Sequence, residues 1–62
     1  MTKEKITFIF KKPDEETLEI YINKKLIGEL NHDQNGWAGM AQAQDLVKSI
    51  AHELGAEVID DY

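Results

Sequence analysis

The segment from Asn31 to Gly36 has residue types that could hold a calcium ion. Oxygen-bearing side chains stand at its first, third and fifth positions, and glycine stands at its sixth. A calcium loop of this type also needs a bidentate glutamate at its twelfth position. That position is Gln42 here, and Asp33 is the one carboxylate in the set. The pattern therefore favours an Asx-rich turn that reverses the chain, and we expect no metal there.

Asp45, Ser49 and His52 have the residue types of a catalytic triad and share one face of a predicted helix. A triad also needs a desolvated base and an oxyanion hole, and a solvated helix in a small domain offers neither. We therefore expect no enzyme activity. The spacing of His32, Asp33 and His52 matches no recurring zinc pattern, so we expect no cofactor either.

Trp37 stands in the segment Gly36–Gly39, at the entrance to the same predicted helix. Tryptophan is largely buried on average, so we expect Trp37 to close one end of the core. The alternative is an exposed anchor for a partner protein, a role that tryptophan also favours. Trp37 is therefore a candidate interaction residue.

Lysines of the first half of the chain could bind single-stranded nucleic acid together with Tyr21, by charge and by stacking. These lysines alternate with acids such as Glu19 and Glu29, and the chain contains no arginine to form bidentate phosphate contacts. Weak nucleic-acid binding is therefore an alternative hypothesis. The lysines are expected at the two ends of a sheet: Lys3, Lys5, Lys24 and Lys25 at one, Lys11 and Lys12 at the other.

The net charge of −5 falls entirely on the second half of the chain. Residues 1–31 hold six lysines and six acids, whereas residues 32–62 hold one lysine and six acids. An acidic helix repels phosphate backbones, so nucleic acid is a poor partner for it. Acidic mimicry of nucleic acid is a weaker alternative, because charge runs are usually solvated turns and tails.

Three segments, residues 5–11, 17–23 and 26–31, alternate in the manner of β-strands. A turn at Pro13 and Asp14 joins the first two. A three-residue loop at 23–25 would pair Ile22 with Leu26 and would put the apolar partners of these strands on one face. The opposite face then carries the predicted interaction residues Ile9, Tyr21 and Ile27.

Residues 37–54 show the periodicity of a helix, with Asn35 as the expected N-cap and Gly55 as the residue after its end. Residues 56–59 are either a short fourth strand or an extended tail over the core, and residues 60–62 are expected to fray. The helix side chains expected to face the sheet are Met40, Ala43, Leu46, Val47, Ile50, Ala51 and Leu54.

The sequence thus predicts one α+β domain over residues 1–62. A three-stranded antiparallel meander is followed by a C-terminal helix on one sheet face. We expect a non-enzymatic protein–protein interaction module or small regulatory protein, with a homodimer through the open sheet face as the simplest case. The chain has no cysteine and no apolar stretch near the ~20 residues of a membrane span, so we expect a cytoplasmic protein without a membrane partner.

Overall fold

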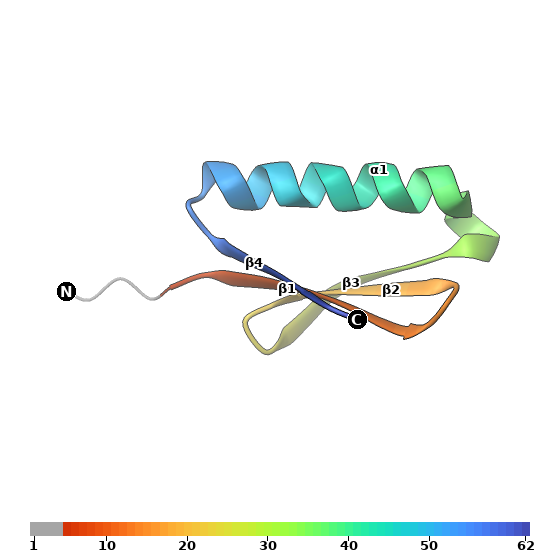
Figure 1. Ribbon diagram of the computed structural model, residues 1–62, viewed down its shortest axis with the longest axis horizontal. Coiled ribbons are helices and arrows are strands. Elements are labelled where there is room, and N and C mark those ends of the chain that lie inside the picture. The colour runs from red at the N-terminus through yellow and green to blue at the C-terminus, as the bar shows by residue number, and fades with distance from the viewer. Residues whose placement is uncertain (1–4) are drawn as a thin grey trace.

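Alternating apolar residues build a four-stranded sheet with one helix on one of its faces (Figure 1). The computed structural model describes residues 5–62 of this α+β fold. The strand order is β3-β2-β1-β4; β1, β2 and β3 are antiparallel neighbours, and β4 runs parallel to β1. The predicted β-β-β-α order is confirmed, and the C-terminal segment is a strand. The elements are β1 (Thr7–Asp14), β2 (Thr17–Ile22), β3 (Lys25–Asn31), α1 (His32–Glu53) and β4 (Glu57–Asp61).

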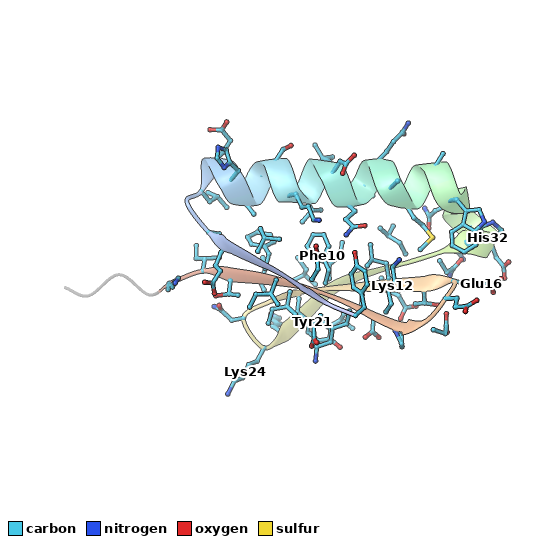
Figure 2. All side chains as sticks on the ribbon, in the orientation of Figure 1. Phe10, Lys12, Glu16, Tyr21, Lys24 and His32 are labelled. Atoms are coloured by element: carbon cyan, nitrogen blue, oxygen red, sulfur yellow. The ribbon has the colours of Figure 1, made fainter. Side chains whose placement is uncertain are left out.

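The core lies between the helix and one face of the sheet. Successive strand residues point to opposite faces, so the alternating apolar residues of β1 and β2 share one face. Figure 2 shows Phe10 between the helix and the sheet. Each fully buried side chain of this size contributes about 1.5–3 kcal/mol. The buried residues are Phe8, Phe10, Leu18, Ile20, Met40 and Ala51.

The first strand is longer than the sequence predicted, because it continues past Lys11 through Pro13 to Asp14. The pairing of β1 with β2 is irregular between Lys11 and Asp14. Such an irregularity accommodates proline, which has no N–H to donate to a neighbouring strand. In the turn that follows, the Asp14 Oδ1 accepts a hydrogen bond from the Glu16 N–H at 2.9 Å.

The connection between β2 and β3 differs from the predicted three-residue loop. Ile22 pairs with Lys25, so the turn has two residues, and Asn23 adopts a left-handed φ of 56°. Tyr21 then pairs with Leu26, and Ile20 pairs with Gly28. A bulge places two residues opposite one, and here the extra residue is Ile27. The predicted Ile22–Leu26 pair is therefore wrong, and the bulge restores the predicted pairing from Ile20 onward.

The helix begins earlier than predicted, and its N-cap is Asn31 rather than Asn35. The Asn31 Oδ1 accepts a hydrogen bond from the Gln34 N–H at 2.9 Å. The first turn ends at Gly36, whose φ of 69° and ψ of 166° are not helical and produce a kink. The residues predicted as a loop therefore form a short capped turn before the main helix. No helix within residues 5–62 combines the length and hydropathy that crossing a membrane requires.

The helix is rotated about its axis relative to the predicted orientation. Met40 and Ala51 are buried against the sheet, and Val47 is half-buried beside them. Leu46 is 62% exposed, and Ile50 and Leu54 are also exposed, so their expected burial is wrong. Ala51, a small residue, is fully buried in the same cluster as the rings of Phe8 and Phe10. The apolar residues of the helix occupy a wider part of its circumference than the sheet covers.

The helix ends as predicted, with Gly55 in the left-handed conformation at a φ of 68°. The chain then returns as β4, and the residues expected to fray are instead held in place. Asp60 and Asp61 belong to the strand, and Asp60 accepts from Lys48 at 3.2 Å. The Tyr62 hydroxyl accepts from the Gln44 side-chain amide at 3.0 Å. These contacts attach α1 to the β4 edge of the sheet.

Candidate functional site: an apolar stripe on the open sheet face

An apolar row crosses all four strands on the sheet face away from the helix. Ile9 pairs with Tyr21 on one side and with Ile59 on the other, and Tyr21 pairs with Leu26. Directly paired residues project to the same face, and Figure 2 shows Tyr21 on the side opposite the helix. Ile27 joins the row, because the bulge sets it beside Leu26 opposite Tyr21. We call this set, Leu26, Ile27, Tyr21, Ile9 and Ile59, the open-face stripe.

The stripe is exposed at its ends and half-buried at its centre. Leu26 is 47% exposed, Ile27 is 48% exposed and Ile59 is 41% exposed. Ile9 and Tyr21, on the two central strands, are half-buried by their neighbours. Single exposed apolar residues are common, but a contiguous set on one sheet face is typical of a contact surface.

Polar and charged residues border the stripe on both sides. One neighbouring row, which we call the charged row, runs Glu29, Glu19, Lys11, Asp61 across the four strands. Within it, the Lys11 Nζ lies 3.8 Å from the Asp61 Oδ2. Thr7 and Glu57 pair on the other side of the stripe. An apolar centre with a polar rim is the usual anatomy of a protein–protein interface.

Tyr21 adds a polar hydroxyl group to the open-face stripe. Its hydroxyl donates a hydrogen bond to the Glu19 Oε1 at 3.1 Å, and the Lys11 Nζ lies 5.3 Å from its ring centre. The hydrogen bond to Glu19 raises the pKa of Tyr21 above its ordinary value of 10.0, with further contributions from desolvation and from the charges of Glu19 and Glu29. The hydroxyl is therefore protonated at physiological pH and donates to the Glu19 carboxylate.

Trp37 does not close the core, which corrects the prediction. Its side chain is 56% exposed, and its ring stacks on His32 with ring centres 4.2 Å apart and planes tilted by 38°. The left-handed conformation of Gly36 turns the chain between these two residues. Trp37 belongs to α1, in the layer on the other side of the sheet, so the structure does not bring it to the open-face stripe.

A second apolar surface lies on the helix itself. Leu46, Ile50 and Leu54 are spaced four residues apart, form one line along α1 and are all exposed. The sequence missed this surface because it assigned these residues to the core. It also missed Leu26, which the two-residue turn places on the open face, and Ile59, which gains its place from the parallel pairing of β4 with β1.

In the segment from Asn31 to Gly36, the side-chain oxygens of both asparagines have structural roles. The Asn31 Oδ1 caps the helix, and the Asn35 Oδ1 accepts from the Asn31 N–H at 3.3 Å, so both oxygens serve backbone groups. Asp45, Ser49 and His52 are exposed on α1. Within the part of the chain that the structure describes, there is no pocket and no group of three metal-ligating side chains.

Two of the predicted nucleic-acid lysines, Lys5 and Lys11, are paired with carboxylates. Lys5 lies 3.4 Å from the Glu57 Oε2, and Lys11 lies near Asp61 as described above. Lys12 instead covers the ring of Tyr62 at 4.6 Å. Lys24 lies at the β2–β3 turn, at the far end of the sheet from the helix entrance at His32 (Figure 2). Lys3 falls outside the described residues.

Comparisons of the chain with protein-family models, with curated proteins and with solved structures give no match. Any functional assignment therefore depends on the residues and their geometry alone.

Proposed function

We propose that this protein is a non-enzymatic protein–protein interaction module that binds through the open-face stripe. One observation carries the proposal: Leu26, Ile27, Tyr21, Ile9 and Ile59 form a continuous apolar row across a sheet face that no element within residues 5–62 covers. Aromatic residues at the centre of such a patch contribute much of the binding energy in interfaces. The lack of cysteine fits a reducing compartment, so we propose a cytoplasmic location as well.

The charges of the open face support a protein partner over nucleic acid. The charged row contains three acids and Lys11, and Lys11 is already beside Asp61. Tyr21 could stack on a base, but its hydroxyl is bonded to Glu19, whose carboxylate repels phosphate. The weak nucleic-acid hypothesis therefore has less support than contact with an apolar protein surface.

The open-face stripe is a better contact surface than the exposed line on the helix. Its side chains stand on four strands joined by hydrogen bonds, so the backbone beneath them is rigid and little conformational entropy is lost on binding. The helix line consists of three residues on one element. Leu46 can therefore serve as a matched control for Leu26.

A photo-crosslinking experiment tests the proposed function. A benzoylphenylalanine at position 27 should form protein crosslinks in living cells, whereas the same group at the exposed position 49 on the helix should not. Leu26→Asp should abolish the crosslinks at position 27, and Leu46→Asp should leave them unchanged. Crosslinks that survive Leu26→Asp, or that form equally from position 49, would contradict binding through the stripe.

A further inference from the structure

At each edge of the sheet, one symmetric register of pairing with the same edge of another copy brings like charges together. Two β4 strands paired antiparallel about Ile59 would set Glu57 opposite Asp61 twice. In β3 the bulge changes which side chains point to each face. A symmetric pair of β3 strands centred on Glu29 keeps side chains of the same face opposite each other. That register brings the two Glu29 carboxylates together. Like charges directly opposite each other destabilise a strand pair. These two edge registers are therefore disfavoured, whereas the open face has no such like-charge contact at its apolar centre.

The open face is complementary to itself under one particular symmetry. Consider two sheets that face each other across a two-fold axis parallel to their strands. Each cross-strand row of one copy then faces the same row of the other copy, with the strand order reversed. The apolar row Leu26–Tyr21–Ile9–Ile59 then meets Ile59–Ile9–Tyr21–Leu26 of the second copy. A surface that matches its own reverse closes as a dimer and leaves no free copy of the patch.

The centre of the charged row is also complementary under this symmetry, whereas its two ends are not. Lys11 of each copy faces Glu19 of the other, so two new ion pairs flank the apolar contact. At the margins, Glu29 faces Asp61 of the second copy, where solvent screens the repulsion and Lys11 partly neutralises Asp61 at 3.8 Å. An axis across the strands would instead set Asp61 against Glu57 and would form no Lys11–Glu19 pair.

We propose that the open-face stripe binds a second copy of this chain, packed face to face about a two-fold axis parallel to the strands. This deepens the proposed function and rests on it. Four strands spaced about 4.8 Å apart and about 20 Å long span roughly 400 Å² before side-chain relief is counted. That area is small for a stable interface, which takes about 800 Å² from each partner. The dimer is therefore weak and forms at high concentration.

Sedimentation equilibrium of the full chain tests the dimer. The wild-type chain should associate to a dimer as its concentration approaches about 1 mM, in the manner of the smallest specific interfaces. Lys11→Glu and Glu19→Lys should each weaken the dimer at least about tenfold, because each sets like charges face to face in both symmetric positions. Circular dichroism should show that both variants remain folded.

Mixing the two single variants gives the sharpest result. The Lys11→Glu chain should pair with the Glu19→Lys chain, because opposite charges then face each other again, and the equimolar mixture should regain dimer formation. The charge clash within each chain is unchanged by mixing, so recovery reports the contact between chains. A mixture as monomeric as its components, or a wild-type chain that is monomeric throughout, would overturn the dimer. If the dimer is overturned but the crosslinks from position 27 lead to a different protein, the proposed interaction function stands without the dimer. If position 27 forms no crosslinks, the dimer and the proposed function both fail.

Discussion

At the scale of single residues, Tyr21 combines the two properties of the open face. Its ring lies at the centre of the stripe, and its hydroxyl connects the stripe to the charged row through Glu19. The sequence identified Tyr21, Ile9 and Ile27 as open-face residues from strand alternation. It placed Trp37 in the core, because burial is the average behaviour of tryptophan, and the turn at Gly36 that exposes it is not evident from composition.

The raised pKa of Tyr21 gives a titration that can be measured directly. In Tyr62→Phe, Tyr21 is the one remaining tyrosine, and its phenolate absorbance should appear at a higher pH than the ordinary value of 10.0. Adding Glu19→Gln should move the midpoint down towards 10.0, because it weakens the hydrogen bond from the hydroxyl and removes the negative charge of Glu19. A midpoint that does not respond to Glu19→Gln would contradict the hydrogen bond.

The same shift has a consequence for stability. Because the fold holds the Tyr21 proton more tightly than the unfolded chain does, this contribution is present at neutral pH and is lost as the pH rises through the raised pKa. Urea unfolding of Tyr62→Phe above about pH 10 should therefore show a steeper loss of stability than unfolding of the same chain with Glu19→Gln.

At the scale of elements, local patterns predicted which segments fold and tertiary packing decided how they meet. Alternation located the first three strands, and Gly55 marked the end of the helix. The bulge at Ile27 was not predictable, because both turn lengths fit the local sequence. The rotation of the helix depends on the rings of Phe8 and Phe10 beneath it, which helical periodicity does not reveal.

Two alanine substitutions in α1 test the helix rotation. Val47→Ala should lower the free energy of unfolding by about 1 kcal/mol or more, because Val47 packs against the core. Leu46→Ala should change it by no more than about 0.5 kcal/mol, as for an ordinary surface position. Chemical denaturation measures both, and a larger cost at Leu46 would show that the predicted orientation was correct.

Two glycines form a matched pair for the backbone. Gly55→Ala should cost about 1–2 kcal/mol, because its left-handed conformation disfavours a Cβ. A Cβ at Gly28 meets no atom within 4 Å, so Gly28→Ala should be neutral or stabilise the fold by up to about 1 kcal/mol. Thermal unfolding of both variants measures the difference. An equal cost at the two sites would argue against the helix end described here.

At the scale of the whole molecule, two layers give this chain one buried interface. Within residues 5–62, six buried residues form the core, and chains below about 70–80 residues rarely gain more than ~3–5 kcal/mol from a core. Phe10→Ala removes a fully buried ring and should cost about 3–5 kcal/mol, enough to unfold the chain at room temperature by circular dichroism. A folded Phe10→Ala chain would mean that the core is not the main source of stability.

The open face is where association could add stability that a core of this size lacks. A dimer through the stripe would turn two layers into four, with the helices outermost. Because ligand binding to the folded state raises apparent stability by mass action, the melting temperature should then rise with protein concentration.

Methyl spectra recorded during dilution test the central claim most directly. We expect the methyl signals of Ile9, Leu26 and Ile59 to shift together as the protein is diluted from high concentration, while those of Leu46 and Ile50 stay fixed. Shifts confined to the helix methyl groups, with the open-face signals unchanged, would contradict association through the stripe.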